Sequence, residues 1–287
     1  MKTLTRPALR YHGGKWRLAS WIISHFPPHV CYVEPFGGAM SVLLRKLPSP
    51  LEVYNDLDEE VITFFRVLRE RPYELEQAIS NTPFSRRELD VAFDAAGDDL
   101  ERARRLYIRA WQGRGGPRAM WRTGWRFQKT MARHKTAISD WTDIAHLQAI
   151  ARRLKQVQIE CDDALTVIKR FDTPDTLFYL DPPYLPSTRS SRWGKHAYTY
   201  EMSEDDHCAL AELLHSIEGM ALISSYPSEM YVELYTDWIS VSKQTKTDAN
   251  TSAMEILWIS PNAMMSKLPL FADNTVVKWR VAAAPDG

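Results

Sequence analysis

Residues 177–184 read Leu-Phe-Tyr-Leu-Asp-Pro-Pro-Tyr, an apolar run that ends in an acid and two consecutive prolines. The run is typical of a buried strand, and proline has no N–H with which to continue a strand ladder. We therefore expect the chain to leave a sheet at Asp181 in a stiff, extended turn. The carboxyl edge of an open α/β sheet is where ligands bind. The Asp181 carboxylate, the Pro182 carbonyl and the Tyr184 ring suit a flat ring that bears an amino group, and a nucleobase is the obvious candidate.

Strand and helix patterns alternate on both sides of this turn. Strands are expected at residues 31–33, 51–54, 157–161, 176–180, 220–224, 238–242 and 255–259. Helices are expected at residues 15–26, 37–47, 58–69, 163–170, 204–217 and 228–234. The alternation predicts one α/β sheet built from both ends of the chain. The last segment, residues 262–287, is weakly patterned and is expected to be a surface extension.

The middle of the chain has a different pattern. Residues 71–153 read as polar helical segments broken by a glycine-rich loop at 112–117, with no convincing strand. We therefore expect two domains, one formed by residues 1–70 and 154–287 and the other by the inserted helical segment 71–153.

Charge is segregated along the sequence, although 36 basic and 36 acidic residues cancel overall. Residues 101–135 hold eleven Lys or Arg and one acid, which gives the segment +10 and leaves 25 − 35 = −10 for the remainder. Trp111, Trp125 and Phe127 are among the aromatic residues interleaved with the basic ones. The pattern favours a surface that meets a polyanion, with a solvated helix face as the alternative.

Cysteine usage and hydropathy exclude several classes of protein. Cys31, Cys161 and Cys208 are widely spaced, so we expect neither a disulfide framework nor a metal site, and a reducing cytoplasm fits best. The sequence begins without an apolar signal core, and it holds no stretch of about 18 apolar residues. Secretion and membrane spanning are therefore not expected.

Two glycine motifs suit a nucleoside ligand. Residues 33–39 leave a strand for a helix, and Gly37 and Gly38 let backbone amides approach a ligand, although the full Gly-x-Gly-x-x-Gly pattern is absent. Asp56 ends the next strand about twenty residues on, where an acid in Rossmann-like folds typically binds ribose hydroxyls. Residues 11–15 read Tyr-His-Gly-Gly-Lys, and Lys15 can pair with a carboxylate or a phosphate. A phosphate loop is the competing interpretation, but the Walker pattern is absent.

In this order the motifs resemble the Dam-type, alpha-class DNA N6-adenine methyltransferases. The resemblance rests on residues 11–15, 33–38, 55–56 and 181–184, with 161–163 as a weaker match, and it spans about residues 8–260. It implies a Rossmann-like class I sheet that uses S-adenosylmethionine, an inserted helical target-recognition domain, and double-stranded DNA as partner. The implied reaction methylates the N6 amine of an adenine flipped out of the duplex. Amino methylation of cytosine or RNA, and a catalytically silent DNA-binding protein, stay open as alternatives.

The resemblance also implies roles for individual residues. The catalytic turn is Asp181, Pro182, Pro183 and Tyr184, in which Asp181 and the Pro182 carbonyl accept hydrogen bonds from the target amine and Tyr184 stacks on the base. The cofactor residues are Tyr11 and Lys15 at the methionine end, Glu34, Pro35, Phe36, Gly37 and Gly38 near the sulfonium, Asp56 at the ribose and Asp163 at the adenine, and Asp181 is expected to contact the cofactor as well as the base. His12, which stands before the two glycines, departs from the commonest family form and is expected to tune cofactor affinity.

The DNA contacts are expected on the basic insertion. The candidates are Arg114, Arg118, Arg122, Arg126 and Lys129, which can contact phosphates or guanine edges. Tyr198 and Tyr200 lie beyond the catalytic turn, either in a loop that closes over DNA or in an ordinary polar loop. We expect a monomer of bacterial or phage origin, and a cognate restriction endonuclease in the same system stays open.

Overall fold

The computed structural model describes residues 4–114, 122, 124–129, 136–189, 198–246 and 252–266, and of Lys246 only the backbone. The strands are β1 Cys31–Glu34, β2 Leu51–Asn55, β3 Gln158–Glu160, β4 Thr176–Leu180, β5 Met220–Ser225, β6 Ile239–Lys246 and β7 Ser252–Ile259. The helices are α1 Ala19–Ile23, α2 Ser41–Arg45, α3 Glu59–Glu70, α4 Pro72–Ser80, α5 Arg86–Val91, α6 Asp99–Gln112, α7 Ala137–Thr142, α8 His146–Leu154, α9 Ala164–Phe171, α10 Glu204–Ser216, α11 Glu229–Leu234 and α12 Pro261–Met265, with a short 3₁₀ helix at Pro186–Thr188.

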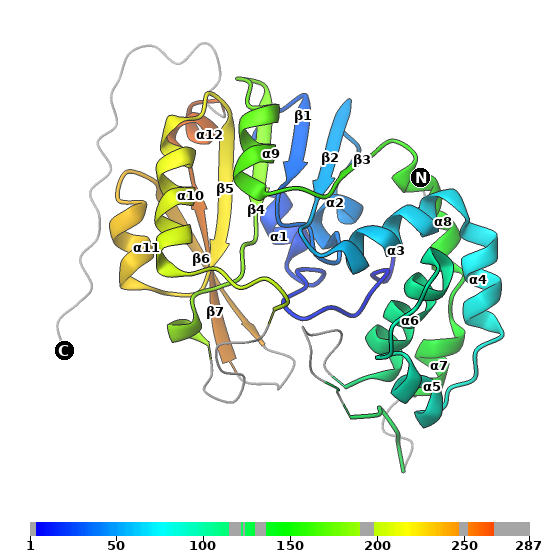
Figure 1. The fold of residues 1–287 in the computed structure, drawn as a ribbon. Coiled ribbons are helices and arrows are strands. Elements are labelled where there is room, and N and C mark those ends of the chain that lie inside the picture. The colour runs from blue at the N-terminus through cyan, green and yellow to red at the C-terminus, as the bar shows by residue number, and fades with distance from the viewer. Residues whose placement is uncertain are drawn as a thin grey trace.

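The described strands form a single sheet in the order β3-β2-β1-β4-β5-β7-β6 (Figure 1). The pairs β1–β2, β1–β4, β2–β3 and β4–β5 are parallel, whereas β7 runs antiparallel to both β5 and β6. All the expected strands are present, and the α/β sheet built from both ends of the chain is confirmed. The strand order reverses between β1 and β4, and such a switch point opens a ligand crevice at the carboxyl edge of a sheet.

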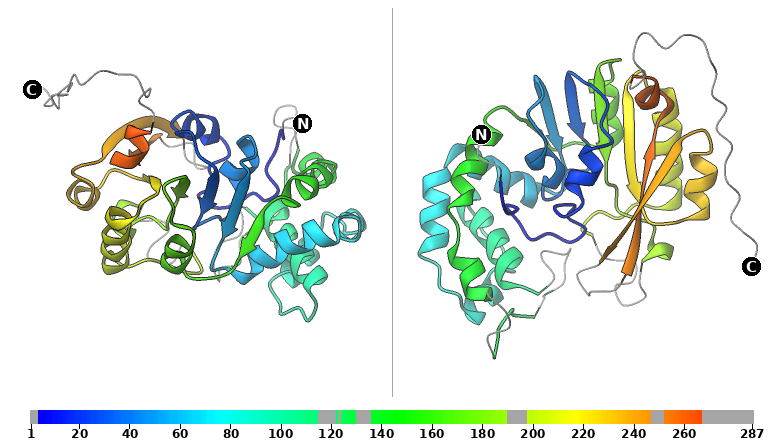
Figure 2. Two further views of the ribbon diagram at one scale, coloured as in Figure 1. Left: turned by 90° about the horizontal axis from the view of Figure 1, so that it is seen from above. Right: turned by 180° about the vertical axis from the view of Figure 1, so that it is seen from behind.

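Alternating side chains of the strands feed two apolar cores, one on each face of the sheet. In β4, Leu177 and Tyr179 belong to the core that also holds residues of α1 and α2, whereas Phe178 and Leu180 belong to the core under α9, α10 and α11. Figure 2 shows the helices on the two faces of the sheet. Because the central strands β4 and β5 are buried on both faces, they read in the sequence as largely apolar runs.

Helices α4 to α8 lie together beyond the β3 edge of the sheet (Figure 1). Helices α4, α6 and α8 pack on α3, and α5 and α7 pack on α6. The expected helical character of this region is confirmed for its described residues, which add a single antiparallel bridge between Gly113 and Trp125. Phe64 of α3 stacks on Tyr107 of α6 with ring centroids 6.2 Å apart, and both belong to the core that continues under the sheet. The helical region therefore shares its apolar core with the sheet.

Three expected elements need correction. The helix expected at residues 37–47 begins only at Ser41, because Gly38 (φ 47°) and Met40 (φ 55°) have left-handed backbone that a right-handed helix cannot include. The helix expected at residues 15–26 is reduced to Ala19–Ile23, preceded by a turn in which the Ala19 N–H donates to the Lys15 carbonyl. The expected surface extension is wrong at its start, because α12 buries Ala263 against β5, and residues 267–287 lie outside the described part.

None of the helices in the described residues is long and apolar enough to cross a membrane.

Candidate active site

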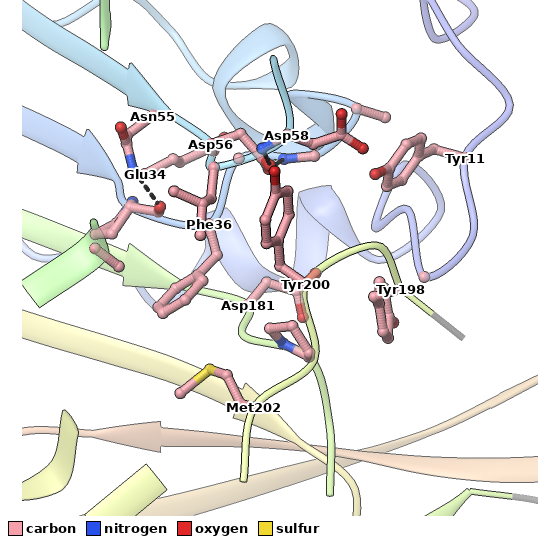
Figure 3. Close-up of a pocket in the computed structure, with 18 of the residues that line it drawn as sticks. Tyr11, Glu34, Phe36, Asn55, Asp56, Asp58, Asp181, Tyr198, Tyr200 and Met202 are labelled. Carbon is pink, nitrogen blue, oxygen red and sulfur yellow. Dashed lines mark hydrogen bonds between the residues drawn. The ribbon is translucent and has the colours of Figure 1, made fainter. Parts of the chain in front are cut away.

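A cavity of about 270 Å³ opens at the carboxyl edge of the sheet, where the strand order reverses (Figure 3). Its wall is formed by the segments that follow β1, β2, β3 and β4, together with residues 11–15 and 198–202. The rings of Tyr11, Phe36, Tyr198 and Tyr200 stand around it (Figure 3). All the residues that were expected to bind the cofactor line this cavity. They are Tyr11, Lys15, Glu34, Pro35, Phe36, Gly37, Gly38, Asp56, Asp163 and Asp181.

The loop after β1 is held by close contacts with β2. A Cβ atom on Gly37 would lie 2.0 Å from the Tyr54 ring, and the Gly37 N–H donates to the Asn55 carbonyl at 2.8 Å. Gly38 donates its N–H to Asp56 at 2.7 Å and accepts from the Tyr54 hydroxyl at 2.6 Å. Packing against Tyr54 within the chain therefore requires glycine at position 37. The sequence analysis had instead explained this glycine by the close approach of a ligand.

Burial changes the acidity of two carboxyl groups in the wall. Burial raises the pKa of Asp56 to about 6, although the Asp58 and Gly38 amides that donate to it favour the ionised form. Burial likewise raises the pKa of Glu34 to about 8, against a hydrogen bond of 2.7 Å from the Tyr32 hydroxyl. Both carboxyl groups therefore bind a proton at a higher pH than carboxyl groups ordinarily do. A cation or a hydrogen-bond donor in the cavity would stabilise the ionised form of each.

Lys15 joins the first motif to the catalytic turn. Its ammonium lies 2.8 Å from Asp181 Oδ1, 3.5 Å from Glu255 Oε1 and 3.0 Å from the Gly13 carbonyl oxygen that accepts from it. Burial opposes the charge, but Asp181 and Glu255 outweigh it and hold the pKa of Lys15 well above its usual range. We call Lys15, Asp181, Glu255 and Tyr184 the Lys15 cluster.

Tyr184 and Glu255 form the buried side of this cluster. The Tyr184 hydroxyl donates to Glu255 Oε1, its ring meets Tyr226 edge-on at 4.7 Å, and the Lys15 ammonium lies 4.8 Å from the ring centroid. Tyr184 is only 6% exposed, and neither it nor Pro182 lines the cavity, whereas Asp181 and Pro183 do. The sequence reasoning missed Glu255; an acid directly before the apolar run 256–259 was the available signal.

Residues 198–202 cover one side of the cavity and are tied to the catalytic turn by Arg189. The Arg189 guanidinium donates to the Tyr184 carbonyl and to Glu201, and it lies 5.0 Å from the Tyr198 ring centroid. Thr199 donates to Asp58 at 3.1 Å across the cavity mouth. Tyr198 and Tyr200 thus belong to the cavity wall.

The basic residues of the insertion are mostly paired. Arg126 lies 2.6 Å from Asp140 and Arg122 lies 3.3 Å from Asp94, whereas Arg114 is exposed and lies 5.3 Å from the Phe127 ring centroid. Lys129 is exposed, and Arg118 lies outside the described residues. The α6 residues Arg102 and Arg109 pair with Glu60 of α3. Among the described residues of segment 101–135, most arginines therefore pair with acids, several of which lie in other segments.

Comparison with known proteins agrees with this geometry. The family described as D12 class N6 adenine-specific DNA methyltransferase matches residues 11–249, which include every segment that lines the cavity. The chain belongs to this family. This D12 class methyltransferase is thus an enzyme that methylates adenine site-specifically in DNA, which decides against cytosine, RNA and a silent DNA-binding protein. Its sheet is the Rossmann-like class I methyltransferase sheet that the resemblance implied.

Individual relatives of the D12 methyltransferase are distant but extend over most of the chain. A DNA adenine methylase from Salmonella typhi is 26% identical over 241 residues, which cover 80% of this chain and 84% of that protein. The type II methyltransferase M1.LlaDCHI from Lactococcus lactis subsp. cremoris is 24% identical and covers 86% of this chain and 91% of its own. A solved SAM-dependent methyltransferase from Agrobacterium tumefaciens, 9% identical, covers 86% of this chain and 60% of that chain with a TM-score of 0.37, too low to add to the assignment.

Proposed function

We propose that the enzyme takes its methyl group from S-adenosylmethionine and transfers it to an adenine flipped out of double-stranded DNA into the cavity. The observation that carries the proposal is that one cavity is lined both by the loops of β1 and β2 and by Asp181. A methyl donor and a target base must meet in one water-poor space for in-line transfer. A base inside a duplex cannot reach such a cavity, so it has to leave the stack.

The lining suits this cofactor. The acidic residues Glu34, Asp56 and Asp163 and the aromatic residue Phe36 line the cavity. A cationic sulfonium is stabilised by nearby carboxylates, and ribose hydroxyls can donate to Asp56, whose oxygens already accept from the Gly38 and Asp58 amides. When bound, S-adenosylmethionine supplies an electrophilic methyl group on a good leaving group.

Asp181 is the residue we assign to the target amine. Lys15 holds Oδ1 of its carboxylate, and within the described residues only Oδ1 has a bonded partner, so Oδ2 can accept from the N6 amine. The Pro182 carbonyl is proposed as the second acceptor; because Pro182 lies outside the cavity wall, this role requires the base to reach the inner end of the turn. Two acceptors favour a tetrahedral nitrogen whose lone pair points at the methyl group, and Asp181 Oδ2 can take the proton that N6 loses. Because Tyr184 is buried, its proposed stacking on the base requires the adenine to reach the inner end of the turn.

The DNA contacts are proposed on the insertion, with Arg114 and Lys129 as the strongest candidates because both are exposed. Arg122 and Arg126 would have to exchange an acidic partner for a phosphate. We also propose a monomer that acts within a restriction–modification pair. The name of the Lactococcus relative, a type II methyltransferase, supports a cognate endonuclease as partner.

The test is transfer of labelled methyl from S-adenosylmethionine to duplex DNA, followed by mass spectrometry of the nucleosides. We expect N6-methyladenine as the product. Asp181→Ala should lower the rate by at least about 10³-fold with DNA affinity within about threefold, because the change removes an acceptor and no DNA-binding group. The matched control is Asp205→Ala at an exposed position of α10, which should leave the rate unchanged. A native protein without methyl transfer to any adenine-containing duplex would overturn the proposal.

A further inference from the structure

Glu255 contacts Tyr184 of the catalytic turn directly and reaches Asp181 through Lys15, from a strand two positions away in the sheet. It lies in β7, which is separated from β4 by β5, and its side chain is 3% exposed. Ser225 stands opposite Ile256 in the antiparallel β5–β7 pair, which brings Glu255 to the carboxyl end of β5. Its carboxylate oxygen Oε1 accepts a hydrogen bond from the Tyr184 hydroxyl and lies 3.5 Å from the Lys15 ammonium.

The geometry of Lys15 depends on this carboxylate. An ammonium group has three N–H donors. The three acceptors around Lys15 are the Gly13 carbonyl at 3.0 Å, Asp181 Oδ1 at 2.8 Å and Glu255 Oε1 at 3.5 Å. With Glu255 in place, the ammonium is balanced between acceptors on three different segments, and Asp181 is fixed through a single oxygen.

The charge balance of the Lys15 cluster also indicates that Glu255 affects Asp181. Two carboxylates share one ammonium, so the ionised Lys15 cluster carries a net charge of −1 at the cavity wall. Without the Glu255 charge, Lys15 would act on Asp181 alone, and the attraction would weaken Asp181 as an acceptor for a neutral amine. Electrostatic effects of this kind are large in a buried site, where water does not screen them.

We propose that Glu255 is a positioning residue for methyl transfer, which acts through Lys15 on Asp181 and through the Tyr184 hydroxyl on the ring of that tyrosine. The inference rests on the proposed function. Glu255 touches neither the base nor the cofactor in this role. It sets the orientation and the acceptor strength of the groups that do.

Glu255→Gln tests the charge, because glutamine keeps the size of the side chain and an oxygen for the Tyr184 hydroxyl. In single turnovers on a duplex that the native enzyme methylates, we expect the rate to fall about 10- to 100-fold, with the affinities for S-adenosylmethionine and DNA within about threefold. Glu255→Asp, which keeps the charge, should lose no more than about tenfold. The matched control is Glu52→Gln, which removes a buried, ion-paired carboxylate outside the cavity wall. It should lower the melting temperature and leave the rate of the folded enzyme unchanged.

A double-mutant cycle shows whether Glu255 acts through Lys15. In a Lys15→Met background, Glu255→Gln should change the single-turnover rate by less than about threefold, because the charge it balances is gone. An equal loss in both backgrounds, or a Glu255→Gln rate within about twofold of native, would overturn the inference while leaving the proposed function intact. Should Glu255→Gln fail to fold, Glu255→Asp in the two backgrounds tests the position of the carboxylate instead: its loss of rate should shrink in the Lys15→Met background, and an equal loss in both would overturn the inference. A native enzyme without activity is a failure of the proposed function instead.

Discussion

Two buried lysines in this molecule are surrounded in the same way and differ in what their partners face. Lys46 donates to Glu52 at 2.6 Å, to Ser49 at 2.7 Å and to the Leu47 carbonyl at 2.8 Å, as Lys15 does to its own three acceptors. Arg153 completes the group by pairing with Glu52 at 2.5 Å. We call Lys46, Glu52 and Arg153 the Lys46 cluster. It lies where β2 begins, whereas the Lys15 cluster lies where β4 ends.

The two clusters have opposite charge balance and opposite access. The Lys46 cluster has two cations for one carboxylate, so burial and the repulsion of Arg153 lower the pKa of Lys46, although Glu52 opposes the shift. Its side chains are 3%, 0% and 5% exposed. In the Lys15 cluster two carboxylates raise the pKa of Lys15, and Asp181 is 18% exposed and lines the cavity. A buried ion pair thus becomes a site when one member keeps an acceptor open to a cavity, and it is structural when all members are enclosed.

Breaking the enclosed cluster should give the largest effect on stability. Glu52→Gln leaves Lys46 and Arg153 buried without a carboxylate, and we expect it to lower the free energy of unfolding by about 3–5 kcal/mol. Thermal and denaturant unfolding measure the loss. Asp181→Asn in the open cluster is the comparison and should lose activity with a smaller loss of stability. A Glu52→Gln protein as stable as native would mean that enclosure does not distinguish the two clusters.

Glu34 lies between the clusters and should give stability a pH dependence. Burial raises its pKa to about 8 from an ordinary value near 4.5, and both Lys46 and Asp181 act on it. The folded state therefore holds a proton that the unfolded state releases, so stability falls as pH rises from about 4.5 to about 8, by at most about 1.4 kcal/mol per pH unit.

Glu34→Gln removes this titration. The melting temperature of the native protein should fall relative to that of the variant between pH 5 and pH 8, by about 2–4 °C for each kcal/mol. Melting curves recorded at several pH values provide the measurement. Parallel curves for the two proteins would show that Glu34 keeps an ordinary pKa in the folded state.

The smallest expected effect is on DNA binding, and it comes from the contrast between an arginine with an acidic partner and one without at the protein surface. Arg114 is exposed, donates through Nε to the Trp125 carbonyl and has no acidic partner among the described residues, whereas Arg126 is paired with Asp140. Arg114→Ala should reduce the slope of log affinity for DNA against log salt concentration by about 1, and Arg126→Ala should leave it nearly unchanged. Fluorescence anisotropy at several salt concentrations measures both slopes. Equal changes in slope for the two variants would show that pairing with Asp140 does not keep Arg126 from binding phosphate, and would contradict the prediction.

Local signals carried much of the fold and of the site. Each expected strand is present, since period and apolar runs reflect burial within a few residues of chain, and α3 begins within one residue of its expected start, with Asp58 as its N-cap. Strands β6 and β7 extend beyond their expected ranges because their outer halves form a mostly solvent-exposed ribbon without an apolar pattern. The late start of α2 depends on the left-handed backbone of Gly38 and Met40, which residue type alone did not reveal.

By itself, the sequence determined the alternation of strands and helices, the turn at Asp181, and the motifs that meet at one edge of the sheet. These features are local, and parallel strands bring their carboxyl ends together whatever the details of packing. Only the tertiary structure decided which charges are neighbours. Glu255 reaches the turn because β7 is antiparallel beside β5, and the arginines of α6 meet Glu60 because α6 packs on α3. Electrostatic interactions act through space over a few ångströms, so the count of charges along the chain did not predict which of them remain open to DNA.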